Sequence, residues 1–167
     1  MFVPPKMVVC VGAVVLQQDR VLFVRQTYGA YKGRWTIPWG FVCDEDGTPQ
    51  PPDVAALREV REEAGVTAVI TGLLGMQNDA NRSGSRSGCR DEPWLYVLFQ
   101  CRHLDGIPTP DGQETDAAVY LSLAEMDSFA EEIEPFSNWL ARRVLHGENG
   151  IIRQSNQTMF PPHMAYL

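Results

Sequence analysis

The sequence lacks a long apolar segment. Its longest uninterrupted apolar run, residues 7–16, is ten residues long, whereas a membrane-spanning helix needs about 20. We therefore expect no helical membrane span. A single lysine precedes this run and no clear cleavage signal follows it, so we expect no secretory leader either.

Closely spaced cysteines and an excess of basic charge are also missing. The four cysteines, Cys10, Cys43, Cys89 and Cys101, show no CxxC spacing, which argues against a zinc site or a redox pair and favours a reducing, cytoplasmic location. Asp and Glu number 21 against 14 Lys and Arg, a net charge of −7. Because nucleic acids favour basic surfaces, we expect no long nucleic-acid partner. A small phosphorylated substrate stays compatible, since metal ions bridge carboxylates and phosphates.

The 167 residues are enough for one ordinary domain with its own core. Two apolar runs, 7–16 and 21–25, flank a polar turn and predict a β-hairpin. Residues 35–42 predict a short strand that Pro38 and Gly40 interrupt. Further strands are predicted at 66–76, 94–101 and 117–121, helices at 53–64, 123–129 and 135–145, and loops at 28–34, 43–52, 78–92 and 102–116. Strands outnumber helices without regular alternation, which favours an α+β fold.

The helix at 53–64 has the clearest end signals. Pro51 and Pro52 stand where a helix can begin, and Asp53 suits the first turn. Gly65 follows the last helical residue, where a left-handed cap is common. At about 100° per residue, Leu57, Val60 and Ala64 share one face, which we expect to pack into the core.

The same helix carries three carboxylates on another face. Glu59, Glu62 and Glu63 share an arc of about 100°, so their charges repel one another. Arg58 can pair with Glu62 at i,i+4 spacing. A Mg²⁺ ion, which takes oxygen ligands and retains waters and substrate phosphates, would offset the repulsion further. The alternative is an ordinary solvated acidic face paired with arginines.

The string 58–66, Arg-Glu-Val-Arg-Glu-Glu-Ala-Gly-Val, matches the second half of the Nudix box, G-x5-E-x7-R-E-U-x-E-E-x-G-U with U aliphatic. With residues 11–16, 21–25 and 35–38 ahead of it, the chain resembles the Nudix hydrolases over about residues 8–145. The resemblance implies a Nudix-type α/β/α sandwich around a mixed sheet. It also implies a single domain, 1–167, with its core at about 8–145 and a C-terminal tail at 147–167.

The first half of the box departs from this pattern. Gly40 matches the opening glycine, but Arg58 follows it by 18 positions instead of 14, so the loop carries about four extra residues. The first glutamate of the box has no clear equivalent: Asp46 stands six residues after Gly40, and Gln50 stands eight before Arg58. In the family that glutamate helps to hold the loop against the helix.

The resemblance implies roles for individual residues. Glu59 and Glu63 would ligate Mg²⁺ or Mn²⁺, and Glu62 would be a further ligand or the base that activates water. Arg58 would orient the glutamates, and Gly40 would offer a backbone carbonyl to the metal.

Six further residues are candidates beside the box. Glu114, in an acidic loop, is a candidate general base or a surface acid. Arg25, at the end of the second strand, is a candidate substrate contact or an exposed strand end. Trp39 could stack on a base or pack in the core. Three arginines of the 78–92 loop could close on phosphates or only solubilise the loop: Arg82, Arg86 and Arg90.

The implied function is metal-dependent hydrolysis of the pyrophosphate bond in a nucleoside diphosphate linked to another moiety, of the ADP-ribose, dinucleotide or nucleoside triphosphate type. The expected partner is therefore a small nucleotide-type substrate, and a homodimer is compatible with the family. The alternative, which the altered first half of the box motivates, is a catalytically silent nucleotide-sensing or protein-binding module.

Overall fold

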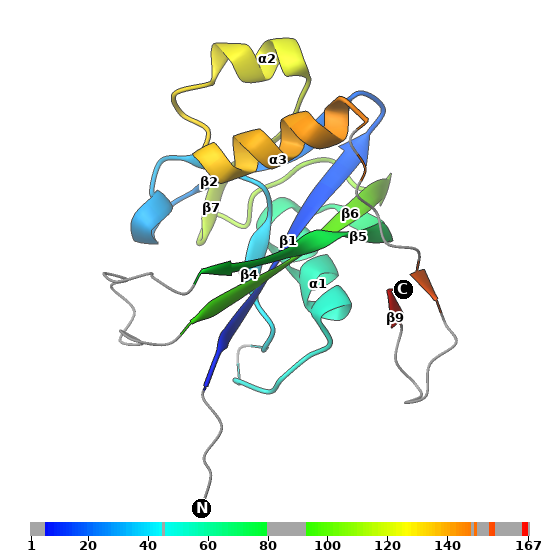
Figure 1. The fold of residues 1–167 in the computed structure, drawn as a ribbon. Coiled ribbons are helices and arrows are strands. Elements are labelled where there is room, and N and C mark those ends of the chain that lie inside the picture. The colour runs from blue at the N-terminus through cyan, green and yellow to red at the C-terminus, as the bar shows by residue number, and fades with distance from the viewer. Residues whose placement is uncertain are drawn as a thin grey trace, which may run out of the picture.

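The computed structural model describes residues 6–44, 46–79, 93–147, 149, 154–155 and 165–166. A mixed β-sheet lies between α1 on one face and α2 and α3 on the other (Figure 1). The central strand β1 (Val8–Gln17) is parallel to β6 (Trp94–Asp105) and antiparallel to β2 (Arg20–Gln26) and β4 (Trp39–Phe41). The α+β class and the layered arrangement predicted from the sequence are confirmed.

The predicted hairpin is formed by β1 and β2, which pair through Leu16 with Val21 and Gln17 with Arg20. The remaining strands extend the sheet on both sides. Strand β3 (Trp35–Thr36) and β7 (Thr115–Leu121) both pair with β2, and β5 (Thr67–Asp79) pairs with β6. A separate two-stranded sheet joins β8 (Gln154–Ser155) and β9 (Ala165–Tyr166).

The interruption predicted at Pro38 separates β3 from β4, whereas Gly40, predicted to interrupt the strand as well, lies within β4. Residues before Pro38 pair with β2, and residues after it pair with β1. The carbonyl of Pro38 accepts a hydrogen bond from Ala13 N at 3.0 Å, which fixes the crossing point. Gly40 thereby lies opposite Val11, where β4 passes α1.

Helix α1 (Pro52–Ala64) begins and ends where the sequence predicts. Gly65 adopts the left-handed conformation at φ 64°, and its N–H donates to Arg61 O. The predicted apolar face packs into the core, where Val60 and Ala64 are fully buried and Leu57 is partly buried against them. Ala55, Ala56, Val60 and Ala64 form the apolar contact with the sheet, and two glutamates are buried beside them.

Two predicted boundaries are wrong. Residues 102–105 belong to β6 and residues 115–116 to β7, rather than to one long loop. The cause is backbone pairing, which does not require apolar side chains: Arg102 pairs with Val69, and His103 pairs with Ala68. The three arginines and Cys89 of the predicted 78–92 loop, and most of the 147–167 tail, lie outside the described residues.

Two helices cover the other face of the sheet, as predicted. Helix α2 (Leu123–Ser128) begins with a capping box between Ser122 and Glu125. Helix α3 (Pro135–Leu145) is capped by the carboxylate of Glu134, which accepts hydrogen bonds from the N–H groups of Phe136 and Ser137. Among the described residues, we find no helix with the length and hydropathy needed to cross a membrane. Figure 1 also places η1 (Gly29–Tyr31), a short 3₁₀ turn, beyond the end of β2.

Candidate functional site

A cleft of about 400 Å³ opens where β4, the C-terminal half of α1 and the loop before β7 come together. It gathers most of the predicted site residues. Its lining includes Trp39, Gly40, Arg58, Glu59, Glu62, Glu63 and Glu114. The topology thus brings one strand, one helix and one distant loop to a single concave surface.

Two of the three helix carboxylates are buried in this cleft. Glu59 is 6% exposed and Glu63 is 2% exposed, whereas the side chain of Glu62 is 46% exposed. Burial raises the pKa of Glu59 to about 7 and the pKa of Glu63 to about 8, because a desolvated carboxylate loses the stabilisation of its charge by water. Glu62 therefore fits the alternative of a solvated acidic face, whereas Glu59 and Glu63 do not.

Glu63 is held by the strands that face the helix. Its carboxylate accepts a hydrogen bond from Gln26 Nε2 at 2.9 Å and another from Trp39 N at 3.0 Å. The hydroxyl of Thr115 donates to the backbone carbonyl of Glu63 at 2.6 Å. These contacts fix the carboxylate in one orientation, and the two donors to it oppose the rise in its pKa that burial causes.

Glu59 packs against β4 and Arg58. The guanidinium of Arg58 lies 2.8 Å from Glu59 Oε1 and 2.6 Å from Glu62 Oε2. A Cβ atom added to Gly40 would overlap the Glu59 carboxyl group. Glycine is therefore required at this point, because only a residue without a side chain lets the strand come so close to the carboxylate.

Glu114 belongs to a loop with a firm backbone. The carboxylate of Asp111 accepts hydrogen bonds from the N–H groups of residues 113, 114 and 115. On the other side, Thr27 N donates to Glu114 O at 2.9 Å. Burial and then the negative charge of Glu114 raise the pKa of Tyr28 to about 12. The loop thus presents Glu114 to the cleft beside Tyr28.

Arg25 does not line the cleft. Its Nε donates to Asp116 at 2.7 Å, and its guanidinium lies 5.7 Å from the centre of the Trp35 ring. The register with β7 shifts between Arg25 and Gln26, and Gln26 is the residue that reaches Glu63. The sequence analysis did not assign this glutamine, although a neutral polar residue that directly follows a run of apolar residues and Arg25 was a usable signal.

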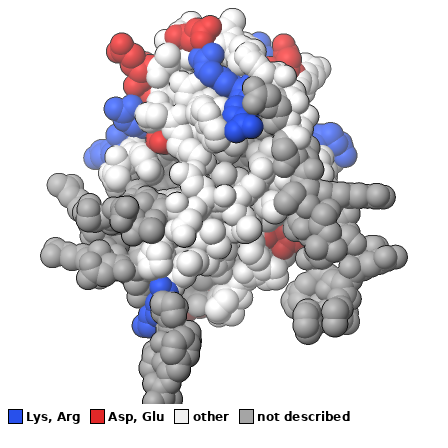
Figure 2. Space-filling model, in the orientation of Figure 1, with Lys and Arg blue, Asp and Glu red and all other residues white. Residues whose placement is uncertain are grey.

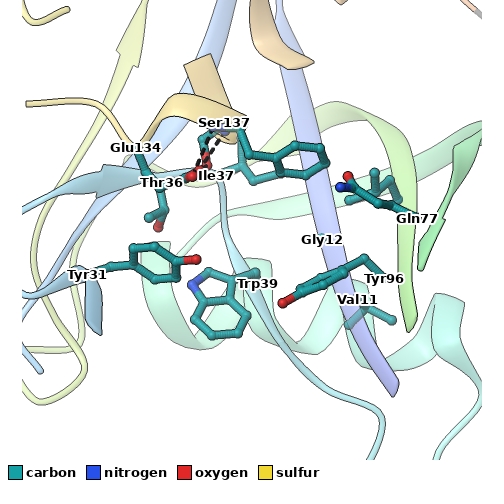
Figure 3. Close-up of a pocket in the computed structure, with 12 residues that line it drawn as sticks. Val11, Gly12, Tyr31, Thr36, Ile37, Trp39, Gln77, Tyr96, Glu134 and Ser137 are labelled. Carbon is teal, nitrogen blue, oxygen red and sulfur yellow. Dashed lines mark hydrogen bonds between the residues drawn. The ribbon is translucent and has the colours of Figure 1, made fainter. Parts of the chain in front are cut away.

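A second pocket, of about 280 Å³, adjoins the cleft through Trp39, which lines both. Figure 3 shows the rings of Tyr31, Trp39 and Tyr96 around it, with the hydroxyl of Thr36 and the carboxylate of Glu134 at its upper side. Tyr31 and Trp39 meet edge to face at 5.8 Å. The pocket therefore combines aromatic walls with a few hydrogen-bonding groups.

The donor set of the cleft fits a hard divalent cation. Within the described residues, no three acidic, histidine or cysteine side chains converge closely enough to enclose an ion by themselves. Glu59 and Glu63 are nevertheless buried carboxylates, and the backbone of Gly40 lies against the first of them. Such a partial set suits Mg²⁺ or Mn²⁺, which also takes waters and substrate phosphates as ligands.

Comparison with known proteins gives a consistent result. An ADP-ribose pyrophosphatase from Methanocaldococcus jannaschii is 28% identical over 75 residues, which cover 44% of this chain and 41% of that protein. A NUDIX hydrolase structure from Nitrosomonas europaea has a TM-score of 0.66 at 23% identity, with coverage of 90% of this chain and 76% of the other. A bifunctional NMN adenylyltransferase/ADP ribose pyrophosphatase from Francisella tularensis, solved with AMP and a manganese ion, has a TM-score of 0.55 at 19% identity, with coverage of 87% and 43%.

The model of the NUDIX domain matches residues 6–140. This range contains every strand and helix that forms the cleft. The predicted family is therefore confirmed: the chain belongs to the NUDIX domain family.

Proposed function

We propose that the protein is a metal-dependent pyrophosphohydrolase that cleaves the diphosphate bridge of a nucleoside diphosphate joined to another group. The observation that carries this proposal is the pair of buried carboxylates, Glu59 and Glu63, beside Gly40 in an open cleft. Burying two carboxylates without a cation is unfavourable, and a diphosphate-bound Mg²⁺ or Mn²⁺ would remove that cost.

The pocket beside the cleft supports a nucleoside as one half of the substrate. Tyr31, Trp39 and Tyr96 offer ring faces and edges of the kind that stack with a planar base. Since Trp39 also lines the cleft, a base in the pocket would leave its phosphates near Glu59 and Glu63. The Methanocaldococcus jannaschii relative supports ADP-ribose as the first substrate to test.

The chain's own groups have distinct roles in this proposal. Glu59, Glu63 and the carbonyl of Gly40 would hold the cation, which when bound supplies charge stabilisation to the phosphoryl oxygens. Arg58 orients Glu59 and Glu62 through its two ion pairs. Glu114 would accept the proton of the attacking water, with Glu62 as the other candidate for this step.

The charge distribution supports a small substrate rather than a polymer. The chain has a net charge of −7. In the described part of the face in Figure 2, basic side chains lie beside acidic ones around α2 and α3, and the surface below them is mostly uncharged. That face offers no continuous basic track for a phosphate backbone.

The experiment is a substrate panel with product identification. ADP-ribose, a dinucleotide such as diadenosine diphosphate, and a nucleoside triphosphate are incubated with the protein in Mg²⁺ or in Mn²⁺. The expected result is metal-dependent release of two phosphorylated fragments from at least one compound, abolished by chelation. Binding of these nucleotides without turnover in either metal would instead support the silent sensing module.

A further inference from the structure

Arg58 is the junction between the cleft carboxylates and the loop that precedes α1. Beyond its ion pairs with Glu59 and Glu62, its Nη2 group donates to the backbone carbonyls of Phe41 and Cys43 at 3.0 and 2.9 Å. Its remaining donor, Nε, reaches Gln50 Oε1 at 3.0 Å. All three nitrogens of the guanidinium are therefore engaged, and Gln50 is the only one of these partners that binds through a neutral side chain.

The extra residues of the loop lie between Gly40 and Gln50, because Gln50 stands eight residues before Arg58, the spacing of the first glutamate of the box. The chain turns back on itself between Val42 and Gln50, where Asp44 N donates to Thr48 O at 3.0 Å and the Asp44 side chain accepts from Thr48 N at 2.8 Å. The turn closes with Gln50 N donating to Val42 O at 2.8 Å. The additional length is thus folded into a closed turn, and Gln50 lies directly across from Val42.

We infer that Gln50 is a positioning residue, whose amide oxygen fixes the plane of the Arg58 guanidinium and thereby the orientation of the Glu59 and Glu62 carboxylates. A planar guanidinium that is anchored through Nε cannot rotate about its long axis without losing its other bonds. Gln50 thus stands at the spacing of the absent glutamate of the box, and the turn ahead of it takes up the extra residues of the loop. This inference rests on the proposed function of the cleft.

The neutrality of Gln50 suits its surroundings. Six carboxylates and one arginine already line the cleft: Asp44, Glu59, Glu62, Glu63, Asp111, Glu114 and Arg58. An amide oxygen accepts the bond from Nε without adding a seventh carboxylate and without competing for the charge of Arg58. The acceptor oxygen, rather than a negative charge, is what the position requires.

The inference predicts how three variants of the full chain differ. Q50L removes the acceptor at similar size, Q50E keeps an acceptor oxygen, and T48V alters a residue of the same turn whose backbone makes the turn's hydrogen bonds. Mn²⁺ affinity is measured by electron paramagnetic resonance, and turnover is measured with the best substrate of the panel. Outer groups that orient metal ligands are worth about 10- to 100-fold in affinity or activity. We expect Q50L to lose that factor in both measurements, and Q50E and T48V to stay within a few-fold of the native protein.

The outcomes separate this inference from the proposed function. Native Mn²⁺ affinity and turnover in Q50L would overturn the inference, and so would an equal loss in T48V. If Q50L does not fold, the shorter Q50N decides, because native Mn²⁺ affinity and turnover in that folded variant, whose amide is one methylene further from Nε, would contradict the acceptor role. If the native protein hydrolyses nothing on the panel, the proposed function fails, but the Mn²⁺ affinities still test Gln50.

Discussion

Gly40 and Glu59 are so close that the strand backbone and the carboxyl group leave no room for a methyl group between them. We predict that G40A displaces the Glu59 carboxylate or pushes β4 away from α1. Turnover should fall by about 100-fold, because such a shift displaces a proposed metal ligand while most of the core is untouched. Steady-state kinetics with circular dichroism would check this, and native turnover in a folded G40A protein would contradict the close approach.

Glu63 is the best-defined carboxylate of the site, because Gln26 and the backbone of Trp39 both donate to it. We expect E63Q to lower turnover by about 100-fold or more, since a neutral amide loses the charge that attracts the cation. The matched control is E131Q, the same substitution at an exposed residue. The backbone oxygen of Glu131 accepts a hydrogen bond from Arg34, which the substitution leaves in place. Unchanged turnover in E63Q would remove Glu63 from the metal site.

The raised pKa values of Glu59 and Glu63, about 7 and about 8, predict how stability depends on pH. In the unfolded chain both groups titrate near pH 4.5, so between that value and pH 8 the folded protein binds more protons than the unfolded one. The contribution of these two groups to the free energy of unfolding of the metal-free protein should therefore be most favourable below about pH 5. It should fall as the pH rises through 7 and 8.

Thermal unfolding in a chelator at several pH values tests this dependence. The melting temperature should drop between pH 6 and pH 9, and the drop should shrink in the E59Q/E63Q variant, where neither group can ionise. Added Mg²⁺ should restore the melting temperature most strongly at pH 9, because the ligands bind the cation in their charged form. A melting temperature that rises over this range in native protein but not in the variant would contradict the raised pKa values.

How much of this site could be predicted from the sequence depends on the range of the interactions. Local signals placed α1 correctly: Pro52 at its start, Gly65 at its end, and the carboxylates on one arc. The burial of Glu59 and Glu63 could not be derived from that arc, because it depends on β4 packing against the helix and on Gln26 at the end of β2. Gln26 likewise joins the site only in the folded chain, where its Nε2 donates to Glu63 Oε1 at 2.9 Å.

The lengthened loop shows the same limit. Counting from Gly40 points to Asp46, and counting back from Arg58 points to Gln50. The sequence alone does not choose between them, because the choice depends on which part of the loop contains the extra residues. In the folded chain Gln50 Oε1 accepts a hydrogen bond from Arg58 Nε, so Gln50 is the residue that meets the arginine. A similar shift between Arg25 and Gln26 decides which of these neighbours faces the helix.

Glu114 and Glu62 are separable as candidates for the proton acceptor. Glu62 is bound to Arg58 at 2.6 Å, and this ion pair occupies one of its oxygens. We therefore expect E114Q to lower kcat by about 10²- to 10⁴-fold with little change in KM, and E62Q to have the smaller effect. A larger kcat loss in E62Q than in E114Q would reverse the assignment. The kinetics should be measured at saturating Mg²⁺, so that a change in metal affinity does not contribute.

Trp39 allows a test of whether the pocket and the cleft act on one molecule. The W39A variant removes the ring shared by both but keeps the backbone N–H that donates to Glu63. Since stacking of a base on an aromatic ring is worth about 1–3 kcal/mol, AMP should inhibit W39A about 5- to 150-fold more weakly than it inhibits the native enzyme. Inorganic pyrophosphate, which has no ring, should inhibit both proteins equally. W139A is the matched control, because Trp139 is half-exposed on α3 and lines neither space. If inhibition by AMP and inhibition by pyrophosphate are weakened equally in W39A, the ring supports the metal site rather than a base. The nucleoside would then have to bind elsewhere.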